Sequence, residues 1–156
     1  MSHTAIVYYS LEGTTKAAAE TLARVTGGDL FRLQPKKEPP KSGFGKMAVG
    51  GFQAILQIDP KLPQVANKLK DYDNVIIAYP VWAGTYPPAV GAFIDQGGLL
   101  GKKVYLVATS GSGNAAKSFS TAHRKLASVS IQDTLSLKGR DQTGIEAFCR
   151  KNSLAK

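Results

Sequence analysis

The segment from Ser10 to Lys16 combines hydroxyl side chains with a glycine directly before an expected helix. Ser10, Thr14 and Thr15 supply the hydroxyls, and Gly13 allows close approach of the backbone. The first amides of a helix have no intrahelical partner, and the helix dipole favours an anion at this end. The spacing therefore suits a phosphate group. The alternative is an ordinary helix cap in which Ser10 or Thr14 satisfies the backbone, and the segment alone leaves both open.

Two further segments, 79–88 and 109–114, carry residue types that suit a flat polar ring. The first places the only tryptophan, Trp82, directly after an apolar run, where it can either stack on a ligand or pack into the core. The second is rich in glycine and serine and can present backbone N–H and C=O groups to a ring edge. By itself it is also an ordinary turn between a strand and a helix.

Five strands and four long helices are expected to position these segments. The strands cover Thr4–Tyr9, Asp29–Leu33, Asn74–Tyr79, Val104–Thr109 and Val129–Leu137. The helices cover Thr14–Val25, a segment opened by Pro87-Pro88 and closed by Gly97-Gly98, Ala115–Ala127 and Thr143–Lys151. The long connection 34–72 is rich in Pro and Gly and is expected to hold short helices near Phe52–Gln57 and Pro63–Lys70.

This alternation predicts an α/β fold over 1–156 as a single domain. Right-handed crossovers between parallel strands place helices on both faces of the sheet, giving a doubly wound five-stranded parallel sheet in three layers, α/β/α. In such sheets, ligands bind beyond the carboxyl ends of the strands. The three polar segments are therefore expected to meet at one edge.

The charge balance is strongly basic, with 20 lysines and arginines against 11 aspartates and glutamates, a formal net charge of +9. An anionic ligand or partner is expected. The basic residues spread from Lys16 to Lys156 without a dense tract, so a solvated surface is favoured over nucleic-acid binding.

Cysteine and histidine usage argues against disulfide and metal chemistry. The single cysteine, Cys149, cannot form an intramolecular disulfide and is expected to be a small core residue. The two histidines form no ligand pattern for a metal. No apolar run is long enough to cross a bilayer, and 1–4 does not resemble a secretory signal, so no membrane contact and a cytoplasmic location are expected.

Together the three segments resemble the flavodoxin family in its broad sense, which includes flavodoxin-like oxidoreductases. The segment 6–16, Ile-Val-Tyr-Tyr-Ser-Leu-Glu-Gly-Thr-Thr-Lys, is similar to that family's first strand and FMN-phosphate loop. The segment 72–85 resembles its Tyr-Asp, strand and Pro-x-Trp-x-Gly region beside the isoalloxazine ring. The segment 109–113 is similar to its third flavin loop.

The resemblance implies FMN as cofactor and the strand order 2-1-3-4-5. It implies cofactor binding by three sets of residues: Ser10, Leu11, Glu12, Gly13, Thr14 and Thr15; Pro80, Val81, Trp82, Ala83 and Gly84; and Thr109, Ser110, Gly111, Ser112 and Gly113. Two features depart from the family. Glu12 stands where threonine is common, and carrier flavodoxins are typically acidic.

These departures favour a reductase that passes electrons from NAD(P)H to a small acceptor such as a quinone. The alternative is a flavodoxin-type carrier between protein partners, and a homodimer stays open. A response-regulator receiver is excluded because Tyr9-Ser10 and Tyr79-Pro80 stand where its acidic residues belong. Two weaker alternatives remain, a dinucleotide-binding domain built on Gly111, Gly113 and Asp133, and a non-enzymatic binding module for nucleic acid.

Overall fold

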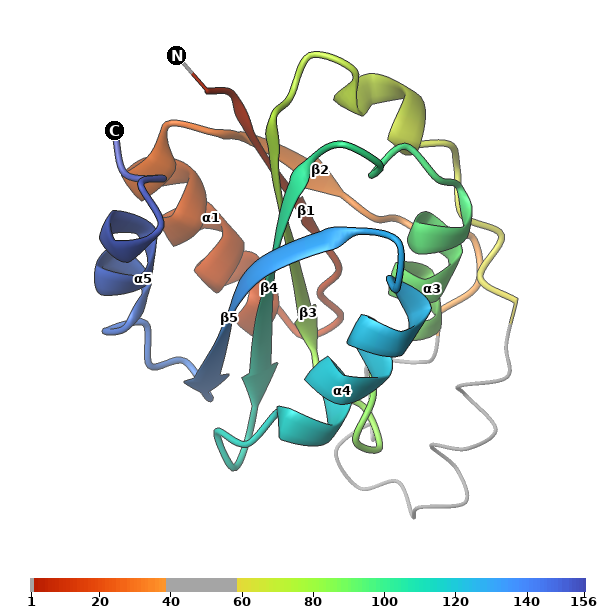
Figure 1. Cartoon of the computed structure of the whole chain (residues 1–156). Helices are drawn as coiled ribbons and strands as arrows, with labels where there is room; N and C mark the ends of the chain where they lie inside the picture. Colours follow the sequence, from red (N-terminus) through yellow and green to blue (C-terminus); the bar gives the residue numbers. More distant parts are fainter. Residues whose placement is uncertain (1, 39–58) are drawn as a thin grey trace.

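The parallel sheet expected from the sequence is present in the computed structural model, which describes residues 2–38 and 59–156. Its five strands run in the order β2-β1-β3-β4-β5, as the family resemblance implied. They are β1 (Thr4–Tyr8), β2 (Asp29–Arg32), β3 (Asn74–Pro80), β4 (Lys103–Ser110) and β5 (Ser130–Lys138). All neighbouring strands pair in parallel, so their carboxyl ends lie at one edge of the sheet (Figure 1).

Helices cover both faces of this sheet in the described residues. They are α1 (Thr14–Thr26), the 3₁₀ turn η2 (Ala66–Leu69), α3 (Pro88–Asp95), α4 (Ala116–Lys125) and α5 (Ile145–Lys151). Figure 1 shows α1 and α5 on one face and α3 and α4 on the other. The fold is therefore the doubly wound, three-layer arrangement that the alternation of strands and helices predicted.

The position of β3 at the centre of the sheet explains why its sequence is continuously apolar. Val75, Ile77 and Tyr79 belong to the core layer that also contains Val90 and Phe93 of α3. Ile76 and Ala78 face the opposite layer, with side chains of α1 and α5. Side chains alternate across a strand, so a strand covered on both faces needs apolar residues at every position.

The segment 63–70 forms less helix than the sequence indicates. Only Ala66–Leu69 is helical, as a 3₁₀ turn. The side-chain carbonyl of Gln96 accepts hydrogen bonds from the N–H groups of Val65 at 2.8 Å and Ala66 at 3.1 Å. This long-range cap holds the start of the turn, and local sequence does not reveal it. The expected helix at Phe52–Gln57 lies outside the described residues.

Helix α5 begins at Ile145, two residues later than Thr143 where it was expected. The carboxylate of Asp141 accepts hydrogen bonds from the N–H of Thr143 at 3.0 Å and from its hydroxyl at 2.8 Å. Such an Asx turn competes with the first helical turn. Within α5, Cys149 is fully buried, and burial raises the pKa of its thiol to about 11. It is the core residue that the sequence predicted.

The described residues include neither a membrane-spanning helix nor a cluster of metal-binding side chains. None of the helices there is long and apolar enough to cross a bilayer. The same part of the chain contains no group of His, Cys, Asp and Glu side chains arranged to hold a metal ion.

Candidate functional site

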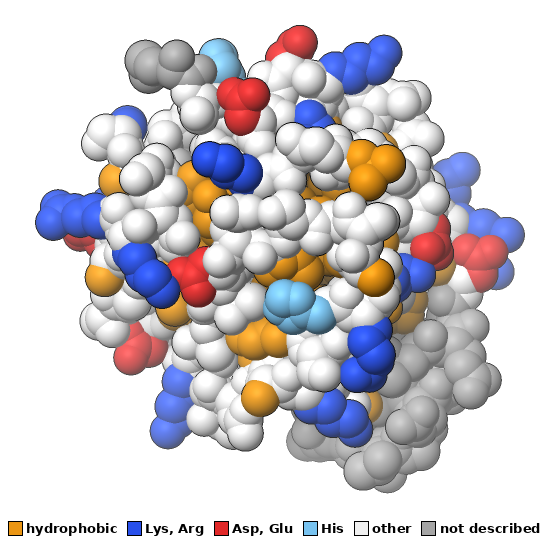
Figure 2. Space-filling model, viewed as in Figure 1, with side chains coloured by type: hydrophobic (Ala, Val, Ile, Leu, Met, Phe, Trp, Pro, Cys, Tyr) orange, Lys and Arg blue, Asp and Glu red, His pale blue; other side chains and the backbone are white. Residues whose placement is uncertain are grey.

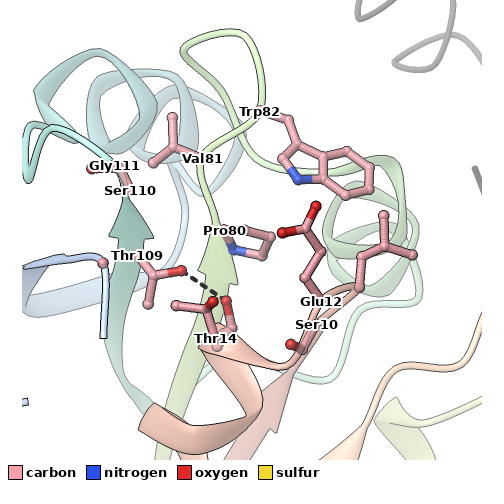
Figure 3. A pocket seen from close by; sticks show the side chains of 12 residues that line it. Ser10, Glu12, Thr14, Pro80, Val81, Trp82, Thr109, Ser110 and Gly111 are labelled. Carbon is pink, nitrogen blue, oxygen red and sulfur yellow. Dashed lines mark hydrogen bonds between the residues drawn. The ribbon is translucent and has the colours of Figure 1, made fainter. Parts of the chain in front are cut away.

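A cavity of about 520 Å³ lies at the carboxyl edge of the sheet, between the ends of β1, β3 and β4. Its volume is in the range of pockets that bind a cofactor-sized molecule. The lining residues come from the three segments singled out in the sequence and from the end of β5: Ser10, Leu11, Glu12, Thr14, Thr15, Pro80, Val81, Trp82, Thr109, Ser110, Gly111 and Gly139. Figure 3 shows the labelled side chains arranged around it.

The loops after β1 and β4 are built alike. The hydroxyl of Ser10 accepts a hydrogen bond from the N–H of Gly13 at 3.1 Å, and that of Ser110 accepts one from Gly113 at 2.9 Å. Both glycines have positive φ, 99° and 78°, a conformation that a side chain would strain. Each serine hydroxyl therefore closes the turn of its own loop. Because the hydroxyl of Ser10 is engaged with Gly13, it does not cap the helical N–H groups of α1.

The two helices that follow these loops start differently. Helix α1 begins after Gly13 and has no side-chain hydrogen bond at its cap. In α4, the side-chain oxygen of Asn114 accepts a hydrogen bond from the N–H of Ala116 at 3.1 Å. The start of α1 is therefore the more available anion site, which favours the phosphate interpretation of segment 10–16 over the helix-cap alternative.

A buried hydrogen bond joins the first and third loops. The hydroxyls of Thr15 and Thr109 lie 2.8 Å apart, and both residues are almost completely buried. Their positions are 94 residues apart in the sequence, so the bond ties the start of α1 to the end of β4. Thr15 thus holds the site together as well as lining it, whereas the hydroxyl of Thr14 has no protein partner among the described residues.

Trp82 combines the two roles that the sequence left open. Its side chain is only 4% exposed and meets the ring of Tyr9 edge-on, with centroids 5.4 Å apart. The same residue lines the cavity. Trp82 therefore belongs to the core and also forms one wall of the site. Burial, together with the nearby carboxylate of Glu38, raises the pKa of the Tyr9 phenol that lies behind it.

The backbone after Trp82 makes a tight turn. Trp82 and Thr85 exchange two N–H···O=C hydrogen bonds of 2.9 Å. Between them, Ala83 and Gly84 both have positive φ, 49° and 76°. Two successive residues with positive φ are typical of a type I′ turn, which is unusual for an alanine. The turn fixes the direction in which Trp82 leaves the sheet.

Glu12 is the one ionisable side chain among the described residues that line the cavity. Its side chain is exposed, and Figure 3 shows its carboxylate directed toward Trp82 and Pro80 rather than toward Thr14. The carboxylate therefore extends from the first loop toward the wall that Trp82 and Pro80 form. The acidic group therefore does not occupy the helix terminus itself.

The remaining predicted site residues lie in the same loops without lining the cavity. They are Gly13, Ala83, Gly84, Ser112 and Gly113. The sequence reasoning missed Gly139, which follows the last residue of β5 and donates its N–H to the carbonyl of Ser110 at 2.7 Å. A lone glycine after a strand does not by itself indicate a site, and Gly139 lies beside the cavity because β5 pairs with β4.

The acidic residue that the dinucleotide-binding alternative requires is engaged elsewhere in the structure. Asp133 lies within β5, where its carboxylate accepts a hydrogen bond from Asn152 at 2.9 Å and pairs with Lys151 at 2.9 Å. Burial alone would raise the pKa of Asp133, but these partners hold it below its ordinary value. Both partners come from the C-terminal helix and its end, so this carboxylate serves packing away from the cavity.

The basic surface shows no single tract on the face seen in Figure 2. Lysine and arginine side chains are scattered there, with acidic side chains between them. Five ion pairs of the described residues engage part of this charge, among them Lys125 with Asp95 at 2.7 Å. On this face, the pattern resembles a solvated surface more than a nucleic-acid footprint.

Solved structures of similar fold cover almost the whole chain. A candidate flavoprotein from Bacteroides eggerthii DSM 20697 is 24% identical, with a TM-score of 0.81 over 98% of this chain and 99% of that one. A flavoprotein in complex with FMN from Lactobacillus acidophilus NCFM is 19% identical, with a TM-score of 0.70 over 94% and 98%. The oxidised flavodoxin 2 of Bacillus cereus is 16% identical, with a TM-score of 0.62 over 98% and 97%. At these identities, the likeness shows the fold.

The family assignment rests on sequence. A family model described as flavodoxin matches residues 3–151, which include every loop around the cavity. The resemblance found in the three polar segments is thereby confirmed over nearly the full length. The chain belongs to the flavodoxin family.

Proposed function

We propose that the cavity at the ends of β1, β3 and β4 binds one FMN, and that the protein is a flavodoxin-like redox protein. The observation that carries the proposal is the single cavity that joins the uncapped start of α1 to Trp82. The phosphate would lie at the amides of the first turn with the hydroxyl of Thr14, and the flat ring would lie between Trp82 and the loop at Ser110-Gly111. Family membership and the FMN complex of a structural neighbour support this cofactor.

The chain's own residues define what bound FMN would experience. FMN supplies one- or two-electron chemistry, and the protein supplies its position and electrostatics. Trp82 and Pro80 would cover one side of the ring with apolar surface. The loop after β4 contains only serine and glycine at 110–113 and so has no large side chain. It would therefore leave the part of the ring next to this loop accessible.

Between the two redox roles, we favour a reductase that transfers electrons from NAD(P)H to a small acceptor such as a quinone. An accessible ring suits direct contact with a nicotinamide and then with an acceptor. The net charge of +9 raises the local concentration of anionic reductants near the protein. Acidic carriers dock on the basic faces of partner proteins, and a basic protein would be repelled by such faces. The overall reaction would convert NADPH, a proton and the quinone into NADP⁺ and the hydroquinone.

The carrier role is the second candidate, favoured by the family match and by flavodoxins among the structural neighbours. The two roles differ in how the flavin is reduced. Under anaerobic conditions, we expect NADPH alone to bleach the FMN-loaded protein, because a reductase accepts hydride directly. The rate should fall as salt screens the basic surface, and added quinone should restore the oxidised spectrum over many turnovers.

The carrier role predicts a different result in the same anaerobic experiment. NADPH would then leave the flavin oxidised until a separate reductase protein is added. FMN free in solution at the same concentration, mixed with NADPH, is the control for reduction that does not need the protein.

A further inference from the structure

A fourth loop reaches the phosphate end of the cavity and brings an arginine with it. Gly139 lines the cavity and is fixed to the end of β4 by its hydrogen bond to the carbonyl of Ser110. The next residue, Arg140, extends toward the first loop. One of its guanidinium nitrogens lies 3.9 Å from the point where a Cβ would stand on Gly13, the residue that precedes α1. The guanidinium therefore lies beside Gly13, the residue from which α1 starts.

No protein group in the described part of the chain engages this guanidinium. The five ion pairs found there do not include Arg140, and its side chain makes no hydrogen bond with these residues. Its neighbour Asp141 is occupied by Thr143, and those hydrogen bonds hold the pKa of Asp141 below its ordinary value. Arg140 is therefore exposed and free to contact a ligand.

Arg32 provides a contrast on the same loop. Its guanidinium donates a hydrogen bond to the carbonyl of Ser10 at 3.1 Å and thereby supports the loop backbone. The two arginines thus differ in their contacts: one holds the loop, and the other faces the start of the helix without a partner.

A phosphate bound at the helix terminus would share the cavity with a second negative charge. A phosphate monoester carries nearly two negative charges at neutral pH, and Glu12, which lines the same cavity, adds a carboxylate. Backbone amides, hydroxyls and the helix dipole favour a bound phosphate, and a neighbouring cation would add to them by offsetting the repulsion from Glu12. A guanidinium can do both, because it forms charge-assisted and often bidentate hydrogen bonds to phosphate oxygens.

We infer that Arg140 binds the phosphate of the flavin and offsets Glu12, so that the site selects FMN over riboflavin. The inference rests on the proposed function, since it assigns a specificity-determining residue to that cofactor. Arg140 would act on binding alone, because the isoalloxazine ring would lie against Trp82, away from the phosphate.

The test compares FMN and riboflavin, which share the ring and the ribityl chain and differ in the phosphate. Dissociation constants are measured with apoprotein by flavin fluorescence for the wild type and for Arg140→Gln. Loss of a hydrogen bond to a charged group should weaken FMN binding about tenfold to a hundredfold. Riboflavin binding should stay within about twofold of wild type, because no phosphate is present to contact Arg140.

Three further variants make the result specific. Arg140→Lys keeps the charge without the planar fork and should recover part of the FMN affinity. Arg24→Gln removes the same charge near the far end of α1 and should leave both dissociation constants unchanged. Glu12→Gln should tighten FMN binding several-fold without tightening riboflavin binding.

The outcomes separate this inference from the proposed function. A wild-type protein that binds neither flavin contradicts the FMN proposal itself. A wild type that binds FMN, with an Arg140→Gln variant whose ratio of FMN to riboflavin affinity is unchanged, overturns the role of Arg140 alone. The same holds if the variant loses both affinities equally, since that would indicate a structural role.

Discussion

Trp82→Ala is expected to lower the free energy of unfolding of the apoprotein by about 3–5 kcal/mol, the usual cost of truncating a large buried aromatic side chain. The indole is 4% exposed and packs edge-on against Tyr9, so truncation leaves a cavity between the end of β3 and the core. Small domains are stable by only about 5–15 kcal/mol, so the loss is a large part of the total. Urea denaturation monitored by circular dichroism measures it.

Leu100→Ala is the matched control for this experiment. Its side chain is 73% exposed, so its truncation should change the free energy of unfolding by no more than about 0.5 kcal/mol. A Trp82→Ala variant that unfolds at the wild-type urea concentration would show that the indole is not packed as described.

Trp82→Phe separates the role in the site from the role in the core. Phenylalanine keeps an aromatic ring against Tyr9 and should retain most of the stability, while FMN binding should weaken because the larger indole wall is lost. In the wild type, this one tryptophan should lose emission when FMN binds. Emission that is identical with and without FMN would place the cofactor away from Trp82.

Replacing Thr14 and Thr15 together by alanine is expected to weaken FMN binding by a few kcal/mol, since each hydrogen bond to a charged group contributes roughly 1.5–3 kcal/mol. The single variants should behave differently. Thr14→Ala should lose FMN affinity roughly tenfold to a hundredfold at unchanged stability, because its hydroxyl has no partner among the described residues. Calorimetric titration of apoprotein with FMN measures the affinity.

Thr15→Ala should also reduce the stability of the apoprotein by about 1–3 kcal/mol, because the buried hydroxyl of Thr109 loses its partner at 2.8 Å. Thr121→Ala is the control for loss of a threonine elsewhere. The hydroxyl of Thr121 donates a hydrogen bond to the carbonyl of Lys117 within α4. FMN affinity that is unchanged in the double variant would remove both threonines from the site.

The fold was predictable because its signals are local. The continuous apolar run of β3 and the proline and glycine residues around α3 follow directly from burial on both faces and from backbone chemistry. The 3₁₀ turn Ala66–Leu69 was not predictable as such, because the Gln96 side chain that caps it lies 30 residues away. Likewise, the late start of α5 depends on the particular turn that Asp141 makes.

The candidate site was predictable in its three loops and not in its fourth. Hydroxyls and glycines after β1 and β4, and the tryptophan after β3, are recognisable residue types at expected places. Gly139-Arg140 carries no such pattern, and its relevance arises only because β5 pairs with β4 and brings the two loop ends together. The hydrogen bond from Thr15 to Thr109 depends on tertiary structure in the same way.

The identity of the bound flavin tests the account most directly. Flavin released by heating the purified protein, or bound when apoprotein is titrated, is identified by chromatography against FMN, FAD and riboflavin standards. We expect FMN, at one per chain, because the cavity offers one phosphate site at the start of α1. Released FAD, or an apoprotein whose spectrum and stability ignore added FMN, would contradict it.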